Sequence, residues 1–262
     1  MSKINIQMSN SFFIPNPLML LVRKLTNLFD NHRAKGKDDL SEIGEVYRTD
    51  KVGKHFYTPH YSSHFERFRH DKINVLEIGV GGYKNAYSGG KSLRMWRSYF
   101  PFANIYSIDI YEKSPIQEER IKIFKGSQVD EVFMDKVVKE IGDLDLIIDD
   151  GSHVNEHVIT TFNLLFPRLK DGGIYVVEDT QTSYWKDMGG DSQNLNNPKT
   201  MMNYFKSLTD SLNNQEFLIP GYQQTYFDQK IVSMHFYHNM VFIYKGNNDE
   251  KSNIVVNNAK PD

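Results

Sequence analysis

Acidic side chains follow two strongly apolar runs in the second half of the chain. Asp150 comes after the run 144–148, and Glu178 and Asp179 follow the run 173–177. In an open α/β sheet the carboxyl ends of parallel strands meet at one crevice, so these three carboxylates would converge there. Their mutual repulsion favours a hard divalent cation between them, and Mg²⁺ prefers oxygen ligands of this kind. The sequence therefore predicts a magnesium site at these acids, although any one of them alone could instead cap a helix.

A glycine-rich turn earlier in the chain is typical of a nucleotide-type cofactor site. Gly79 and Gly81 follow the apolar run 74–78, and glycine lets the backbone approach a ligand closely. Asp109 ends the next apolar run, where an acid can accept hydrogen bonds from ribose hydroxyls. The turn lacks the G-x-G-x-x-G spacing of a dinucleotide site. Because Glu77 is an acid inside this turn, we expect a cationic ligand such as S-adenosylmethionine (SAM), which carries a sulfonium and an ammonium group.

His153 is the expected general base of the same crevice. It lies three residues after Asp150, in a loop or first helical turn above the expected metal. An imidazole beside a metal ion can take the proton of a substrate hydroxyl before that oxygen attacks a methyl group, so His153 and Asp150 are the expected catalytic residues. Asp149 points to the other side of its strand and could cap a helix, contact the cofactor or bind metal. His157, one helical turn on, is more simply a supporting or solvent-facing residue.

Strands and helices alternate along the chain, which predicts a parallel sheet. Apolar runs and helix-compatible stretches set the expected elements. The expected strands are 74–78, 104–110, 121–125, 144–148 and 173–177, and the expected helices are 92–99, 131–141 and 156–169. The sequence Asp171-Gly-Gly173 would stop the last helix, and the runs 230–238 and 239–245 predict an antiparallel hairpin. The expected fold is α/β, a Rossmann-like, mostly parallel sheet with helices on both faces and an antiparallel C-terminal hairpin.

Length and composition indicate the class of protein and its domain organisation. It has 262 residues, 39% of them hydrophobic, a net charge of −2, a pI near 6.5 and no cysteine. These values suit one large globular domain and disfavour a nucleic-acid partner. We expect an N-terminal helical extension at 1–40, the main domain at 41–246 and a polar tail at 247–262. The apolar segment 12–22 is interrupted by prolines, so we expect neither a signal peptide nor a membrane span, and a cytoplasmic location.

Three further segments leave alternatives open. The expected helix 18–29 could pack its apolar face on the domain or on a second subunit, and we expect a homo-oligomer. Residues 186–198 are predicted to form a mobile loop that could cover the site, and residues 199–212 a helix. Five aromatic residues could stack on a sugar or could equally belong to the core. They are Tyr184, Trp185, Tyr222, Tyr226 and Phe227.

The motifs together resemble a known enzyme family. The segments Leu76–Tyr83, Gly90–Trp96, Tyr106–Asp109, Asp149–His153 and Glu178–Thr180 are similar to the metal-dependent class I SAM methyltransferases that O-methylate sugars of macrolide antibiotics, the mycinamicin type. The resemblance covers roughly residues 40 to 245. It implies SAM and Mg²⁺ as cofactors, S-adenosylhomocysteine (SAH) as product, and methyl transfer to a hydroxyl of a sugar or glycosylated small molecule in natural-product or surface-polysaccharide biosynthesis.

The resemblance also implies roles for individual residues. It implies that Asp150, Glu178 and Asp179 bind Mg²⁺ and that His153 is the base. The segments Tyr47–Lys51 and His55–Thr58 look like the cofactor-covering element of the family. The residues expected at the cofactor are Glu77 and Gly79 at its methionine part, Asp109 at the ribose, Gln128 at the adenine, and Gly81, Asp149, Tyr57 and Thr58 around it.

The acceptor remains open at this stage. The macrolide enzymes carry an additional N-terminal domain, whereas only about 40 residues precede the match here, which loosens the assignment of the substrate. One alternative is a methyltransferase acting on nitrogen, a phosphate-linked group or a catechol. Another is a SAM-binding subunit without turnover, which the acid cluster beside His153 disfavours.

Overall fold

The computed structural model describes residues 16–253; residues 12–15 of the apolar N-terminal segment and residues 254–262 of the expected tail lie outside the described part. A seven-stranded sheet forms the centre of the molecule, in the order β3-β2-β1-β4-β5-β7-β6. Strands β1 to β5 are parallel, and β6 and β7 are antiparallel to their neighbours. The strands are β1 (Asn74–Ile78), β2 (Asn104–Asp109), β3 (Ile121–Lys125), β4 (Leu144–Asp149), β5 (Leu169–Glu178), β6 (Ile231–Tyr237) and β7 (Met240–Lys245).

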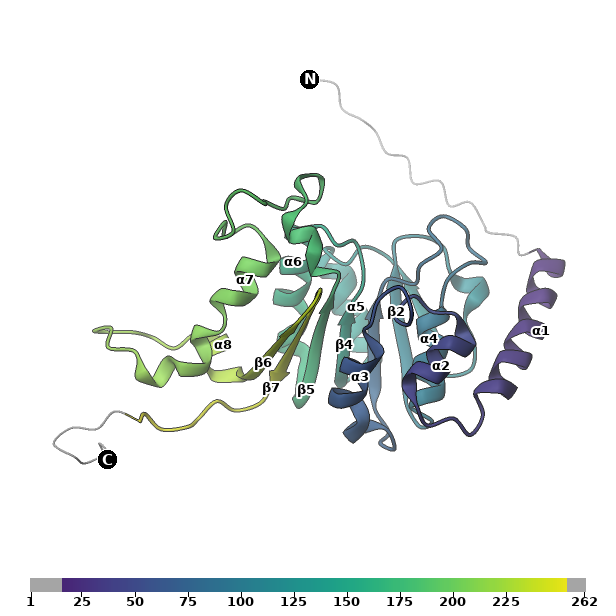
Figure 1. The fold of residues 1–262 in the computed structure, drawn as a ribbon, viewed down its shortest axis with the longest axis horizontal. Helices are drawn as coiled ribbons and strands as arrows, with labels where there is room; N and C mark the ends of the chain where they lie inside the picture. The colour runs from purple at the N-terminus through teal and green to yellow at the C-terminus, as the bar shows by residue number, and fades with distance from the viewer. Residues whose placement is uncertain (1–15, 254–262) are drawn as a thin grey trace, which may run out of the picture.

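Helices cover both faces of this sheet (Figure 1). On one face lie α2 (Leu40–Tyr47), α3 (Thr58–Phe65) and α4 (Lys91–Tyr99), and on the other α5 (Glu131–Ile141), α6 (Asn155–Leu165) and α7 (Met201–Ser207). The short α8 (Tyr226–Lys230) precedes β6, and α1 (Pro17–Ala34) stands at the far edge of the molecule. None of the helices in residues 16–253 has the length and apolar character needed to cross a membrane.

The central strands are apolar on both sides because both sides are covered. Val75 packs toward α2 to α4, whereas Leu76 packs toward α5 to α7, and Val176 and Val177 divide in the same way. Successive side chains of a strand point to opposite faces, so a doubly covered strand is a continuous apolar run. The expected fold class is therefore confirmed, with strand bounds within a few residues of those expected.

The end of α6 and the start of β5 differ from the expectation. The helix ends at Leu165 instead of 169, and Asp171–Gly173 lies inside β5 instead of stopping a helix. Pro167 explains the difference, since proline lacks the N–H that a helix needs and restricts the residue before it. The expected single helix 199–212 is also wrong: α7 ends at Ser207, and a separate 3₁₀ segment follows at Asp210–Glu216.

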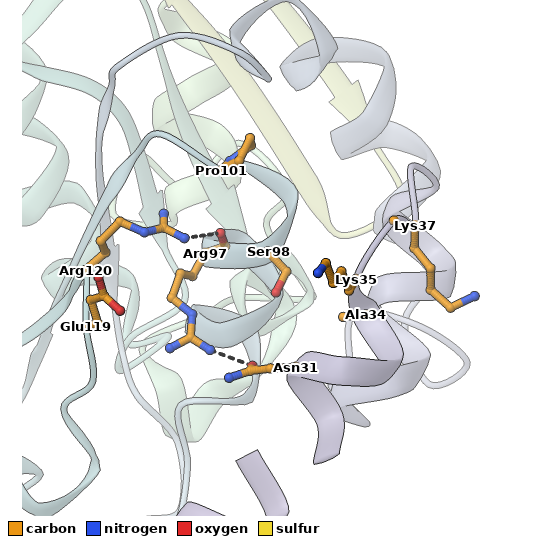
Figure 2. A pocket seen from close by; sticks show the side chains of 10 residues that line it. Asn31, Ala34, Lys35, Lys37, Arg97, Ser98, Pro101, Glu119 and Arg120 are labelled. Carbon is orange, nitrogen blue, oxygen red and sulfur yellow. Dashed lines mark hydrogen bonds between the residues drawn. The ribbon is translucent and has the colours of Figure 1, made fainter. Parts of the chain in front are cut away.

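Helix α1 is amphipathic, and its polar stripe faces the domain. Asn27, Asp30 and Asn31 are spaced to lie on one face, and they bond Glu118, Arg48 and the pair Tyr47 and Arg97, respectively. Figure 2 shows the bond from Arg97 to Asn31 beside a hollow of about 440 Å³ at the end of the helix. Seven large apolar residues of α1 are exposed, whereas Ala34 at its end is buried in the core. The seven are Leu18, Met19, Leu21, Val22, Leu25, Leu28 and Phe29.

Candidate active site

A cleft of about 1060 Å³ opens at the carboxyl ends of the parallel strands. It lies where the strand order reverses, between β1 and β4, which is the usual ligand position in open α/β sheets. Its walls come from the turns after β1, β2, β3 and β4 and from the loop between α2 and α3. Of the residues singled out from the sequence, Glu77, Gly79, Gly81, Asp109, Gln128, Asp150, His153 and Asp179 line it.

The glycine-rich turn brings two backbone segments into direct contact. Gly79 has φ of +95°, and a Cβ atom built there would lie 2.1 Å from the carbonyl oxygen of Asp150. Only glycine permits both this conformation and this approach. The turn after β1 is therefore held against the Asp150 loop after β4, which places the expected cofactor site and the acid cluster side by side.

Glu77 is fixed at the floor of the cleft by residues of α4. Its side chain is 1% exposed and accepts hydrogen bonds from the Ser92 hydroxyl, at 2.6 Å, and from the Trp96 indole N–H. Burial raises the pKa of Glu77 to about 7, against the opposing charge of Lys51. Burial makes charge on this carboxylate costly, and a cation bound beside it would offset that cost. Ser92 and Trp96 lie in the Gly90–Trp96 motif, but the sequence alone gave them no role.

Asp109 and Gln128, both expected at the cofactor, line the cleft, whereas Asp149 does not. The Asp109 carboxylate accepts from the backbone N–H groups of Val80 and Tyr111, at 3.2 and 2.8 Å, which orients it. Gln128 lines the cleft, and its amide oxygen accepts from the Ser152 N–H at 2.9 Å. Asp149 instead lies behind the cleft, 1% exposed, because it points to the opposite face of β4 from Asp150.

The buried Asp149 carboxylate is held by hydrogen bonds from neighbouring side chains. Gln128 and Tyr175 donate hydrogen bonds to it, at 3.3 and 3.4 Å. Burial raises the pKa of Asp149 to about 7. The same Gln128 amide donates to Thr161 of α6, so Asp149 and Gln128 tie the loop after β4 to that helix.

Asp150, His153 and Asp179 meet at the edge of the cleft. One ligand atom from each lies within 4.8 Å of the others, and this is the one group of that kind among residues 16–253. His153 Nε2 is 3.9 Å from Asp150 and 3.7 Å from Asp179. His153 and Asp179 both have φ of +55°, a left-handed conformation that is uncommon outside glycine and clusters at functional sites.

Tyr57 holds Asp179 from the side of the covering loop. Its hydroxyl donates to the carboxylate at 2.7 Å. Burial alone would raise the pKa of Asp179, but the bond from Tyr57 and the neighbouring His153 and His55 hold it below its usual value. Asp179 is therefore an ionised, oriented oxygen donor. Thr58 does not reach the cleft, because its hydroxyl bonds Ser41 of α2 at 2.9 Å.

Glu178 lies just beneath this group and is paired with a lysine. Its carboxylate is 2% exposed, with Lys51 Nζ at 2.6 and 2.7 Å from its two oxygens and the Tyr61 hydroxyl donating to one of them. Lys51 also bonds Asp150 at 2.7 Å. Burial and the nearby Asp150 raise the pKa of Glu178, which Lys51 opposes. Sequence reasoning placed Lys51 in the covering segment but missed this ion pair.

The proposed aromatic wall does not form at the cleft. Phe227 stacks on Phe162 with ring centroids 5.5 Å apart, and Tyr226 meets Phe166 edge to face. Tyr222 donates a hydrogen bond to Asp228. Tyr226 and Phe227 thus pack around α6 and α8, as the alternative interpretation held, whereas Tyr184 and Trp185 are 43% and 52% exposed and are not among the residues that line the cleft.

Known proteins resemble this chain over most of its length. No protein-family model matches it. It is 46% identical over 216 residues to mycinamicin VI 2''-O-methyltransferase from Micromonospora griseorubida and 45% identical over 218 residues to demethylmacrocin O-methyltransferase from Streptomyces fradiae. A third relative, at 41%, is a tetracenomycin 3'-O-methyltransferase from Streptomyces olivaceus. The first two alignments cover 82% of this chain but 54% and 55% of the relatives, so the chain spans about half their length.

A solved structure supports the same relationship. A methyltransferase of the mycinamycin biosynthetic pathway, in complex with Mg, SAH and mycinamycin VI, superposes with a TM-score of 0.79 at 46% identity. The match covers 82% of this chain and 55% of that protein. Over the residues that align, the chain is therefore a relative of the mycinamicin, demethylmacrocin and tetracenomycin O-methyltransferases, and it has a class I Rossmann-like methyltransferase fold.

Proposed function

We propose that this protein transfers a methyl group from SAM to a hydroxyl of a sugar or glycosylated small molecule in natural-product or surface-polysaccharide biosynthesis. One observation carries the proposal. Asp150, His153 and Asp179 border the same cleft as Glu77 and the glycine-rich turn. A cation-binding acid cluster and a candidate base thus adjoin a site suited to a cationic cofactor. The relatives, which are O-methyltransferases by name, support the same chemistry.

The residues present fit both SAM and Mg²⁺. Glu77 would face the cationic methionine part of SAM, Gly79 and Gly81 would allow close approach, and Asp109 and Gln128 would hold the nucleoside. Asp150 and Asp179 offer partly exposed carboxylate oxygens, the donor type that Mg²⁺ prefers, and Glu178 lies directly behind them. When bound, Mg²⁺ would lower the pKa of an acceptor hydroxyl and favour acceptors with two neighbouring oxygens.

His153 would then complete the reaction as general base. Nε2 takes the proton of the acceptor hydroxyl, and the imidazolium is stabilised by the adjacent Asp150 and Asp179. The acceptor oxygen forms its bond to the methyl carbon while the carbon–sulfur bond breaks, and the electron pair leaves with sulfur as SAH. The bond from the Thr182 hydroxyl to the His153 backbone carbonyl, at 2.7 Å, holds the main chain from which the ring extends.

The experiment that tests this proposal is SAH release from SAM, measured over a panel of nucleotide sugars, glycosides and catechols. Each reaction is run with Mg²⁺, with EDTA, and with Mg²⁺ restored in excess. We expect release only with a sugar-containing acceptor, abolished by EDTA and recovered with Mg²⁺. Release that ignores EDTA would remove the metal from the proposal, and release with catechols alone would replace the acceptor. Bound SAM without release on any acceptor would favour a non-catalytic subunit.

We further propose that the protein works as a homo-oligomer in the cytoplasm. The exposed apolar stripe of α1 is the supporting feature, since its polar stripe is already used against the domain. Two copies could pair these stripes about a two-fold axis. The proposed division of the chain is a helical extension at 1–40, the methyltransferase domain at 41–246 and a tail at 247–262.

A further inference from the structure

Lys51 lies among three carboxylates, those of Asp150, Glu178 and Glu77. Its side chain is 1% exposed, and its ammonium group contacts three carboxylate oxygens: one of Asp150 at 2.7 Å and both of Glu178 at 2.6 and 2.7 Å. An ammonium has three N–H donors, and these contacts use all three. Glu77 lies 3.8 Å away. The lysine is therefore a fully bonded cation among three acids.

This pairing determines which oxygens remain for a metal. One oxygen of Glu178 accepts from both Lys51 and Tyr61, and the other accepts from Lys51. Asp150 gives one oxygen to Lys51 and keeps its other oxygen on the His153 side. Asp150 and Asp179 are thus available at the cleft, whereas Glu178 is engaged by an internal positive charge.

A divalent cation and the ammonium would compete for the same carboxylates. Both are positive, so a metal at Asp150 would be repelled by Lys51 at short range in a region of low dielectric. The ammonium also stabilises the buried acids when no metal is present, since unpaired buried carboxylates are strongly destabilising. We propose that Lys51 is a built-in cation that competes with the divalent metal for Glu178 and Asp150 and so sets the metal affinity of the site. This proposal rests on the proposed metal site but not on methyl transfer.

The test measures the affinity of metal-stripped protein for Mn²⁺ in the absence of SAM and acceptor. The electron paramagnetic resonance signal of free Mn²⁺ reports how much of the metal is unbound. We expect Lys51→Met to bind Mn²⁺ at least about tenfold more tightly than the native protein, because a like charge is removed and Glu178 is released. Lys51→Arg keeps the charge and should show no such gain. Lys136→Met is the matched control: it removes an exposed lysine of α5 that does not line the cleft, and it should leave the affinity unchanged.

A gain in affinity separates competition from a structural role, because damage to the site would weaken binding. Equal or weaker Mn²⁺ binding by a folded Lys51→Met protein would overturn the proposal. If that variant folds only with metal, its melting temperature is followed against Mn²⁺ concentration instead. A rise larger than in the native protein supports competition, and an equal or smaller rise contradicts it. Because no methyl donor is present, these outcomes do not depend on whether the protein is a methyltransferase.

Discussion

At the scale of single residues, His153 carries the sharpest expectation for catalysis. Replacing it with alanine removes the proposed base while leaving Glu77 and Asp109 in place. We expect turnover to fall by about 10² to 10⁴, the usual contribution of a general base, with SAM affinity unchanged. SAH release at saturating acceptor and calorimetric SAM binding would measure the two quantities. Near-normal turnover with native SAM affinity would exclude His153 as base. The control is His157→Ala, which loses a contact to Ser152 and should show a smaller loss of turnover.

Sequence patterns predict the site residues that lie at the ends of strands. They do not predict the residues whose position depends on contacts between distant parts of the chain. Asp150 and Asp179 reach one cleft because parallel strands end at one edge. Lys51 is 127 positions from Glu178 in sequence and lies in a polar loop, where a lysine is ordinarily solvent-exposed. Its burial depends on how the loop between α2 and α3 folds over the sheet, which no local pattern encodes.

At the scale of elements, the orientation of α1 leads to a prediction about assembly. Leu21 and Leu25 are 54% and 59% exposed on its outer stripe. If two copies pair there, the double variant Leu21→Glu, Leu25→Glu should weaken association by at least about 100-fold, because it removes apolar burial and adds repelling charges. Light scattering behind size-exclusion chromatography would show the change in mass. Lys24→Glu is the control, because it alters the charge of the same helix without removing apolar area. An unchanged mass for the double variant would contradict the pairing.

The secondary structure was largely predictable, and the exceptions have local causes. The strands followed from apolar runs because both sheet faces are buried. The prediction ends α6 too late because Gly172 and Gly173 resemble a helix stop, whereas the helix already ends before Pro167. Helices α2 and α3 were not predicted as elements: each has eight residues, and helices this short depend on packing more than on propensity.

At the scale of the whole molecule, His64 gives folding a dependence on pH. It bonds Tyr244 and Tyr237 between α3 and the hairpin of β6 and β7. Burial, with His235, His60 and Arg67 nearby, lowers the pKa of His64 to about 4 from an ordinary 6.5. Between these values the unfolded chain binds a proton that the folded protein does not, so the free energy of unfolding should fall as pH drops from 6.5 to 4.

The measurement is a series of urea unfolding midpoints from pH 7 to pH 4.5 for the native protein and His64→Gln. We expect a shallower loss of stability in the variant. The comparison isolates His64, because Glu77 and Asp149, whose pKa values are raised to about 7, contribute in the opposite direction and equally in both proteins. Parallel curves for the two proteins would rule out this role.

The contact between Gly79 and the Asp150 loop has a consequence for how the proposed enzyme could diversify. Because the two turns touch backbone to backbone, the spacing between the proposed cofactor site and the Asp150 side of the cleft is set by the main chain that follows β1 and β4. Side-chain changes elsewhere leave that spacing intact. In the proposed enzyme, variation in the surface segment 186–198 would therefore leave the distance between the two turns unchanged.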